Sequence, residues 1–548
     1  MRDVTPNMLD YEETYQNFKL DVPEHFNFGF DVVDRWAEDH TKLALVSVDP
    51  TGEHAQKHTF WDLKVLSNRF ANLLRGLGAS KGDRTFIMTP RIPEWYVAVL
   101  GMMKLGVVPM PATPLCTPHD IEYRLNRAEA SVAITDLENA HKVEEVVAKC
   151  PSLKHIILVD GTSRGWINYD EEMPRMSARL DEVEPTRSAD PLLIYFTSGT
   201  VGPPKMVLHT QASYAIAHVT TARFWHDLNP TDLHWAISDT GWAKMAYGKL
   251  FGQWTQGAAI LQHNARGRFD AALTLKMLER YGVTSFCAPP TAYRMMVLED
   301  LKKYDFSNLR HCTGAGEPLN PEVMKIWEEG TGLTIYDGYG QTETVLLVAN
   351  YRCMPVKPGS MGKPIPGFHI AIVDDDGNQL PPGEEGQIAV RVNPQRPVGM
   401  LKEYWKDPEA MADSFRGDWY FTGDKAYKDE DGYFWFVGRA DDVIKSAGYR
   451  IGPFEVESAL IEHPAVAESA VVASPDAIRG DIVKAFVILK PGYVPSEELT
   501  RSLQEHVRRV TAPYKYPRAI EYVSELPKTI SGKIRRVELR QRELERAS

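Results

Sequence analysis

The sequence is poor in cysteine, with five in 548 residues and no CxxC pair. An odd number without close pairs fits neither a disulfide framework nor a thiolate zinc site, and it is typical of a reducing compartment. Long apolar runs are also lacking, because the longest, over residues 95–103, is far shorter than the about 20 residues that a membrane-spanning helix needs. We therefore expect no structural disulfide and no membrane insertion. The cysteines are Cys116, Cys150, Cys287, Cys312 and Cys353.

The N-terminus lacks the features of a targeting segment. It reads MRDVTPNMLDYEETYQ, which is acidic within its first dozen residues. A secretory signal would carry an apolar stretch there, and a mitochondrial one would be rich in Arg and Ser and poor in acids. The sequence therefore predicts a cytoplasmic protein.

Basic residues are fewer than acidic ones, with 62 Lys and Arg against 74 Asp and Glu and a net charge of −12. This balance argues against a nucleic-acid-binding protein. Residues 501–548 are the exception, since they hold 12 Lys and Arg against 6 Asp and Glu. The HExxH zinc motif is missing as well, and Ser198, in TSG at residues 197–199, does not stand in a GxSxG nucleophile elbow.

Helical and strand-like apolar patterns alternate through the first 350 residues. Helical spacing predicts a helix from the cap residue Thr59 to Gly78 and a buried helix over residues 94–105. Such helices between short strands are typical of parallel βαβ units and hence of an α/β fold. The strands are expected at 85–88, 107–109, 131–135, 154–159, 258–261 and 284–287.

The pattern changes after about residue 355. Short strands at 369–373, 387–392, 419–422 and 433–437, separated by turn signals, predict a small β-rich subdomain over about 355–438. Residues 439–548 then form a separate unit of mixed α and β structure. In it we expect helices at 454–462 and 496–510, strands at 468–473 and 483–489, and a βαβ-like arrangement.

One loop has the composition of a phosphate-binding loop. Residues 195–206 read YFTSGTVGPPKM, in which small residues let backbone N–H groups approach phosphate oxygens and Lys205 adds a cation. It is not a Walker A loop, because the glycine spacing differs and Met206 stands where a hydroxyl would be needed. Taken alone, the loop is equally well interpreted as a tight turn rich in Gly and Pro.

Five further motifs follow this loop in order: GAGEP at 314–318, DGYGQTE at 337–343, YFTGD at 420–424, GRADDVIKSAGYR at 438–450 and PKTISGKIRR at 527–536. Together the six resemble the core motifs of the adenylate-forming superfamily of acyl-CoA synthetases, luciferases and peptide-synthetase adenylation domains. The resemblance spans nearly the whole chain. The residues at 287–291, 452–458 and 511–518 are most similar to those of medium-chain acyl-CoA synthetases.

The resemblance implies a large N-terminal domain over residues 1–438, called the body below, and a small mobile lid over residues 439–548 with a hinge near Asp441. It also implies an ATP-dependent acyl-CoA synthetase. A carboxylic acid, expected to be medium-chain, branched or aromatic, would form acyl-AMP with release of pyrophosphate, and the acyl group would then pass to coenzyme A. An adenylating ligase that hands acyl-AMP to a carrier protein or another acceptor is the alternative. A non-catalytic homologue is disfavoured, because Lys533 and Glu343 are both present.

The resemblance also implies the roles of individual residues. Lys533, Thr342 and Glu343 would be catalytic, with Glu343 holding Mg²⁺, and Asp424 and Arg439 would bind the ribose. For each the alternative is an ordinary surface residue or ion pair, and Val201 departs from the small or hydroxyl residue usual at its position. The remaining ATP or AMP contacts would be Thr197, Ser198, Gly199, Thr200, Val201, Gly202, Pro203, Pro204, Lys205, Gly316, Glu317, Pro318, Asp337, Gly338, Tyr339, Gly340 and Gln341.

Two further sets of residues complete the expected site, one for the acyl pocket and one for coenzyme A. For both sets the alternative is that the residues are ordinary solvated arginines or core residues. Gly340 stands where acetate-specific relatives have a Trp that closes the acyl pocket, so its lack of a side chain would leave room for a longer acid. The other expected acyl-pocket residues are Trp242, Lys244, Tyr247 and Cys287. The expected coenzyme A contacts are Ala447, Gly448, Tyr449, Arg450, Arg479, Arg508, Tyr516, Pro517 and Arg518. The sequence leaves the oligomeric state open.

Overall fold

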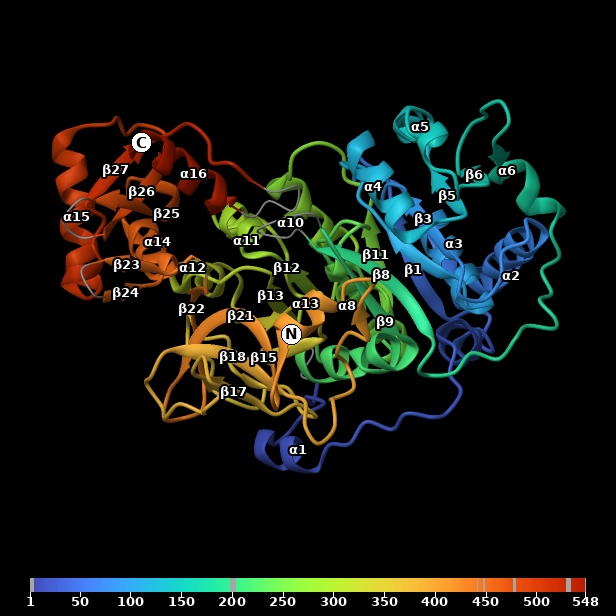
Figure 1. Cartoon of the computed structure of the whole chain (residues 1–548), viewed down its shortest axis with the longest axis horizontal. Coiled ribbons are helices and arrows are strands. Elements are labelled where there is room, and N and C mark those ends of the chain that lie inside the picture. Colours follow the sequence, from blue (N-terminus) through green and yellow to red (C-terminus); the bar gives the residue numbers. More distant parts are fainter. Residues whose placement is uncertain are drawn as a thin grey trace.

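The structure, a computed structural model of the chain, describes residues 4–197, 204–440, 442–446, 449–476, 480–528 and 534–547. Figure 1 shows the body as a broad assembly of sheets and helices, with the lid at one end of it in orange and red. Within the described ranges, no helix combines the length and the apolar character that crossing a membrane requires.

The largest sheet has nine strands in the order β16-β15-β14-β13-β12-β10-β11-β1-β2. Its centre, from β1 to β14, is parallel, whereas β2, β15 and β16 run antiparallel at the edges. Helices in the connections cover its faces: α8 (Ala243–Lys249), α10 (Ala271–Arg280), α11 (Pro290–Met296) and α12 (Pro321–Thr331). The strands are β1 (Leu43–Val48), β2 (Ala55–Thr59), β10 (Leu233–Ala236), β11 (Ala259–His263), β12 (Ser285–Ala288), β13 (His311–Ala315), β14 (Ile335–Gly340), β15 (Leu346–Ala349) and β16 (Lys363–Pro364).

A second, wholly parallel sheet has the order β4-β3-β5-β6-β7. The predicted cap is confirmed, since the Thr59 hydroxyl accepts from the Asp62 backbone in a capping box at the start of α2 (Phe60–Gly76). The predicted buried helix is confirmed as α3 (Pro93–Leu105). The other elements are β3 (Arg84–Met88), β4 (Val108–Pro111), β5 (Val132–Thr135), β6 (His155–Leu158), β7 (Ile167–Asn168), α4 (Pro118–Ala128) and α5 (Leu137–Glu144).

Two antiparallel sheets complete the body. One joins β8 (Pro191–Thr197), β9 (Lys205–Thr210) and the short β19 (Glu403–Tyr404). The other corresponds to the predicted β-rich subdomain and holds β17 (Ile370–Val373), β18 (Gly386–Arg391), β20 (Phe415–Arg416), β21 (Trp419–Lys428) and β22 (Phe434–Arg439). The remaining α-helices are α1 (Tyr11–Asn17), α6 (Tyr169–Glu172), α7 (His218–Thr220), α9 (Phe251–Thr255) and α13 (Pro408–Ser414).

The lid is built on a sheet of five strands. Its long strands β25 (Val466–Asp476) and β26 (Gly480–Leu489) pair antiparallel, so the βαβ-like expectation is wrong for them. Only a few residues connect the two strands, too few for the crossover that parallel pairing requires. The expectation does fit β26, α15 (Glu497–Val510) and β27 (Ala519–Tyr522), because β26 and β27 are parallel. The other elements are β23 (Ile444–Ser446), β24 (Tyr449–Ile451), α14 (Pro453–Glu462) and α16 (Arg536–Ala547).

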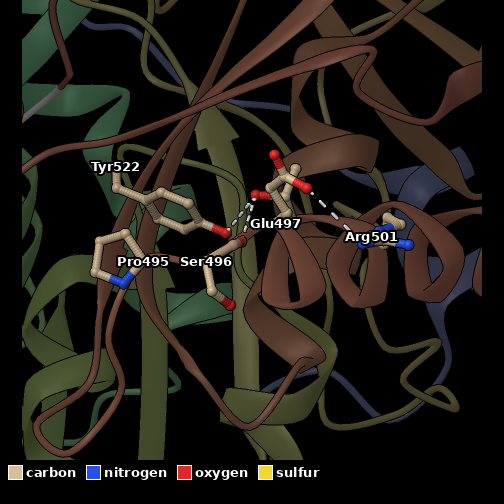
Figure 2. Close-up of a pocket in the computed structure, with 6 residues that line it drawn as sticks. Pro495, Ser496, Glu497, Arg501 and Tyr522 are labelled. Atoms are coloured by element: carbon tan, nitrogen blue, oxygen red, sulfur yellow. Dashed lines mark hydrogen bonds and ion pairs between the residues drawn. The ribbon is translucent and has the colours of Figure 1, made fainter.

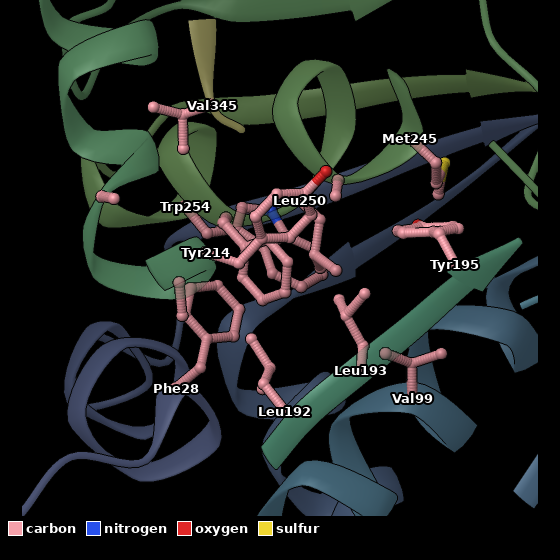
Figure 3. Packing of buried hydrophobic residues seen from close by; sticks show 14 of the residues in the cluster. Phe28, Val99, Leu192, Leu193, Tyr195, Tyr214, Met245, Leu250, Trp254 and Val345 are labelled. Atoms are coloured by element: carbon pink, nitrogen blue, oxygen red, sulfur yellow. The ribbon is translucent and has the colours of Figure 1, made fainter. Parts of the chain in front are cut away.

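The main hydrophobic core joins the large sheet to the segments around it. Figure 3 shows Phe28, Leu192, Tyr214 and Trp254 converging in its centre. The one polar atom of the Trp254 ring, Nε1, donates a 3.1 Å hydrogen bond to the Ala44 carbonyl. Burial of such large rings fixes how the sheets meet, and with them the strand ends that carry the motifs.

Candidate active site

Two of the motifs and Cys287 lie where the parallel strands of the large sheet end. GAGEP begins in β13, DGYGQTE lies in β14 and just beyond it, and Cys287 lies near the end of β12, which pairs with β13. The carboxyl ends of parallel strands lie at one edge of a sheet, which is the usual place of a ligand site in such folds. Segments that are separated in the sequence are thus neighbours in the sheet.

The Asp424 carboxylate is held by the DGYGQTE motif. The Tyr339 hydroxyl donates to Oδ2 of Asp424 at 2.6 Å, and Nε2 of Gln341 donates to the same oxygen at 2.8 Å. The Tyr420 hydroxyl in turn donates to Oε1 of Gln341 at 3.0 Å. Asp424 on β21 lies opposite Arg439 on β22. The structure therefore brings together four predicted nucleotide-binding residues, and Tyr420 orients one of them.

Glu343 ends the same motif and lies near Asp424. The Tyr404 hydroxyl donates to its Oε1 at 3.0 Å. Burial raises the pKa of the Glu343 carboxyl, while the Tyr404 hydrogen bond and the nearby Lys205 lower it. The adjoining Thr342 carbonyl accepts a 2.7 Å hydrogen bond from Nε2 of His209, whose pKa burial lowers to about 3. A neutral histidine thus holds the backbone next to Glu343.

The oxygen atoms of Glu343 suit a magnesium ion that is bound together with phosphate, and do not suit a metal held by protein side chains alone. No group of three or more His, Cys, Asp or Glu able to hold a metal occurs in the part of the chain that the structure describes. Mg²⁺ needs only one or two protein carboxylates when phosphate oxygens and water complete its shell. Glu343, with one oxygen engaged by Tyr404 and further lone pairs available, meets that requirement.

Asp337 lies deeper than the sequence indicated. It is 4% exposed, and burial raises the pKa of its carboxyl well above its usual range. Its Oδ1 is buried and has no hydrogen-bond partner among the described residues. An acceptor in this state suits a donor supplied by a ligand, such as the adenine amino group.

Three of the expected acyl-pocket residues come together. Nζ of Lys244 donates to the carbonyl of Ala315, in the GAGEP motif, at 2.9 Å. Burial raises the pKa values of the Cys287 thiol and the Tyr247 hydroxyl, and Asp337 contributes to both shifts. Trp242 directly precedes α8, the helix that carries Lys244 and Tyr247.

The backbone around Gly340 explains why this position has no side chain. It is exposed at the end of β14, and a Cβ added there would lie 2.8 Å from the Val345 carbonyl oxygen. The glycine permits this close approach of β14 to the following chain. The expected extra room in the acyl pocket stays a prediction.

Several predicted residues lie outside the described residues: Ser198, Gly199, Thr200, Val201, Gly202, Pro203, Asp441, Ala447, Gly448, Arg479, Lys533 and the side chain of Arg450. The strands that flank the phosphate loop are described, with Thr197 opposite Lys205 in the β8–β9 pair. Pro204 follows the loop, and its carbonyl accepts from the Tyr123 hydroxyl at 3.1 Å. Lys205 therefore stands at a fixed strand end.

The described coenzyme A candidates gather on the lid. The guanidinium groups of Arg508 and Arg518 lie 3.7 Å and 4.8 Å from the centroid of the Tyr516 ring. Nη1 of Arg518 also donates to the Tyr516 hydroxyl at 2.7 Å. Tyr449 is 52% exposed and stacks on Tyr514 at 4.2 Å. This surface pairs aromatic faces with cations, a combination that suits a nucleotide with phosphates.

The lid also has a hollow of about 500 Å³ that contains none of the predicted site residues. Figure 2 shows that Tyr522 from β27 points toward the start of α15. The Tyr522 hydroxyl lies 2.9 Å from Oγ1 of Thr500. The residues that line the hollow are Pro495, Ser496, Glu497, Thr500, Arg501 and Tyr522.

Sequence reasoning missed the contacts that join the segments. Tyr404 carried no signal, since its role depends on where β19 pairs. The contact of Asn320 with Ser458, in which Nδ2 donates to the lid carbonyl at 3.4 Å, depends on how body and lid dock. Arg540, for which the sequence offered no role, pairs with Asp442 beside the expected hinge.

Comparison with known families agrees with this geometry. Residues 33–405 match the family model for AMP-binding enzymes, and residues 455–533 match that for the C-terminal domain of AMP-binding enzymes. The chain belongs to the AMP-binding, adenylate-forming family. The human acyl-coenzyme A synthetase ACSM3, mitochondrial, is 48% identical over 553 residues, which cover 99% of this chain and 94% of that protein. The human ACSM4 enzyme, also named mitochondrial, is 48% identical over 550 residues, or 98% of this chain and 94% of that protein.

Solved structures are similar over almost the whole length. The anthranilate CoA ligase AuaEII in complex with anthranoyl-AMP superposes with a TM-score of 0.88 at 33% identity, covering 96% of this chain and 99% of that one. A benzoate CoA ligase from Burkholderia xenovorans LB400 gives a TM-score of 0.82 at 28% identity, covering 94% and 100%. These likenesses confirm the predicted α/β fold with a large body and a small C-terminal domain.

The comparisons confirm most of the functional prediction and correct one part of it. The chain is an ATP-dependent acyl-CoA synthetase, an AMP-forming acid–thiol ligase close to the medium-chain enzymes. The expectation of a cytoplasmic protein is wrong, because the curated relatives at 48% identity are named mitochondrial. That expectation depended on the composition of the first residues and on the cysteine content, which are weak guides to location.

Proposed function

We propose that this acyl-CoA synthetase acts on a medium-chain, branched or aromatic carboxylic acid. The observation that carries the proposal is the grouping of Lys244, Tyr247 and Cys287 near Asp337, with Nζ of Lys244 bound to the Ala315 carbonyl. A pocket of aromatic and apolar character there would gain about 0.8 kcal/mol for each CH₂ group that it buries. The ligases with anthranilate and benzoate in their names support an aromatic acid as one member of this class.

In the first step a carboxylate oxygen of the acid attacks the α-phosphorus of ATP, and pyrophosphate leaves. We assign Lys533 to the charge that builds on the α-phosphate and the attacking oxygen, where a cation stabilises the transition state. Thr342 would contact the α-phosphate. Asp424, held by Tyr339 and Gln341, would accept hydrogen bonds from the ribose hydroxyls, with Arg439 beside it.

The triphosphate would lie between the phosphate loop, residues 197–205, and Glu343. We assign Glu343 to Mg²⁺, which when bound neutralises charge on the phosphate oxygens. The adenine ring would lie between Tyr339 and the backbone of residues 316–318, near the unpartnered oxygen of Asp337.

In the second step the thiol of coenzyme A attacks the carbonyl carbon of acyl-AMP, a thioester forms and AMP leaves. We propose that the lid rotates about Asp441 between the steps, so that residues 447–450 line the path of the thiol. The aromatic and cationic surface around Tyr516 would then hold the nucleotide part of coenzyme A.

A pyrophosphate-release screen tests the acid class. Linear acids of two to twelve carbons, branched acids and aromatic acids are supplied with ATP and coenzyme A, and kcat/KM is measured for each. We expect kcat/KM to rise about fourfold per added CH₂, the equivalent of about 0.8 kcal/mol, up to a medium chain length. Acetate as the best acid would overturn the proposed class. Product formed only with a carrier protein in place of coenzyme A would favour the alternative ligase.

A further inference from the structure

One aromatic side chain contacts two groups of opposite charge in the proposed ATP site. The Tyr404 hydroxyl donates to Oε1 of Glu343 at 3.0 Å. Nζ of Lys205 lies 4.9 Å from the centroid of the Tyr404 ring. Tyr404 is only 4% exposed, so packing restricts its ring to this arrangement. No motif in the sequence singled it out.

The backbone around Tyr404 joins the same two segments. In β19, Tyr404 lies opposite Val207 of β9, the strand that Lys205 begins. The Leu401 amide donates to the Glu343 carbonyl at 2.7 Å, and the Trp405 amide donates to the Met206 carbonyl at 2.8 Å. The chain from 401 to 405 thus hydrogen-bonds to both segments. The position of Tyr404 is set by this pairing and not by its side chain alone.

Such an arrangement has a physical purpose in a phosphate site. A hydrogen bond donated to a metal-binding carboxylate fixes the direction in which its other oxygen points. A cation over an aromatic ring gains about 0.5–2 kcal/mol and loses freedom of position. With both contacts on one side chain, the distance between the Lys205 ammonium and the Glu343 carboxylate is fixed before ATP binds. Preorganised charges need no rearrangement during the reaction.

We propose that Tyr404 is a positioning residue for the adenylation step: its hydroxyl orients Glu343 toward magnesium-bound ATP, and its ring places the Lys205 ammonium. The proposal rests on the roles assigned above to Glu343 and Lys205. Tyr404 itself touches neither substrate nor metal. Its loss therefore affects the binding of magnesium-bound ATP and the first half-reaction, and leaves the transfer to coenzyme A intact.

The test compares Tyr404→Phe with a matched control, Tyr433→Phe. Tyr433 is also 4% exposed, donates to the Pro355 carbonyl at 2.6 Å, and has Nζ of Lys357 at 4.5 Å from its ring centroid. It therefore loses the same hydroxyl in the same kind of setting, outside the ATP motifs. Calorimetric binding of ATP is measured against magnesium concentration. Acyl-adenylate formation is followed by pyrophosphate exchange, and thioester formation is followed from supplied acyl-AMP.

We expect Tyr404→Phe to raise the magnesium concentration for half-maximal ATP binding about tenfold to a hundredfold, which is the loss of one hydrogen bond to a charged group. ATP binding without magnesium and thioester formation should stay unchanged, and Tyr433→Phe should match the wild type. Tyr404→Leu, which also removes the ring under Lys205, should in addition weaken ATP binding without magnesium. A purely structural role would lower the melting temperature without shifting the magnesium dependence.

Equal magnesium dependence in Tyr404→Phe and Tyr433→Phe would overturn the proposal. Glu343→Gln, measured alongside, separates this failure from a failure of the assigned roles. If Glu343→Gln raises the magnesium requirement and Tyr404→Phe does not, only the inference about Tyr404 falls. If Glu343→Gln changes nothing, the role of Glu343 falls and the inference falls with it.

Discussion

The guanidinium of Arg536 binds the carboxylate of Glu457 through two nitrogens, with Nε 3.0 Å from Oε1 and Nη2 2.7 Å from Oε2. The Val471 amide also donates to Oε1 at 2.8 Å. One carboxylate thus ties the start of α16 to α14 and to β25. Arg536 follows Lys533 by three residues, so the pair anchors one end of the segment that carries the proposed catalytic lysine.

We expect Arg536→Gln to lower the free energy of unfolding of the lid by about 2 kcal/mol. The reason is that Glu457, whose side chain is 7% exposed, would keep a buried charge without its partner. The neighbouring Arg535 is the matched control, because its pair with Glu538 is largely exposed and worth at most about 0.5 kcal/mol. Differential scanning calorimetry of Arg536→Gln and Arg535→Gln measures the two losses of stability. An equal decrease in the free energy of unfolding in both variants would contradict a larger contribution of the Arg536–Glu457 pair.

Lys533→Ala should separate the two half-reactions. Pyrophosphate exchange should fall by a factor of about 100 or more, since a preorganised cation at the transition state typically contributes at least that much. Thioester formation from supplied acyl-AMP should be largely retained, because the second step does not use this lysine. Rapid-quench measurement of each half-reaction decides the matter, and an equal loss in both would contradict the assigned role.

Asp424→Asn should weaken ATP binding about tenfold, the equivalent of about 1.4 kcal/mol. Tyr339 and Gln341 both donate to one oxygen of this carboxylate, and an amide nitrogen in its place would face donors. Asp429→Asn is the control, because Asp429 accepts from Lys357 and Trp435 in the same subdomain and has no assigned ATP contact. Equilibrium binding of ATP to both variants is the measurement. An unchanged dissociation constant in Asp424→Asn would remove Asp424 from the site.

Stability should decrease as the pH falls below about 6.5, the usual pKa of a histidine in an unfolded chain. Burial lowers the pKa of His234 to about 3 and that of His311 to about 4, although Asp232 opposes the shift at His234 and Asp227 at His311. Between these values and 6.5 the unfolded chain binds protons that the folded chain does not, so each histidine lowers the free energy of unfolding by about 1.4 kcal/mol per pH unit. Urea unfolding of the wild type and His234→Gln at pH 5, 6 and 7 measures this slope. Equal slopes would contradict a neutral His234.

Local patterns predicted the local structure well. Thr59 caps its helix as expected, and the apolar residues 94–105 form a buried helix, because capping and helical spacing depend on residues one or two turns apart. The prediction failed for β25 and β26, whose apolar patterns carry no information on the direction of pairing. Gly340 shows a similar limit, since its contact with the following chain comes from the approach of β14 to β15.

The sequence by itself determined the family and the reaction and predicted the residues of the ATP site, because all of these depend on short, ordered segments. Tertiary structure alone decided how those residues hold one another: that Asp424 accepts from Tyr339 and Gln341, and that Tyr404 connects Glu343 with Lys205. The physical reason is that these contacts depend on strand register between segments far apart in the chain. A shift of one residue in the β9–β19 pair would turn Tyr404 to the other face of its sheet.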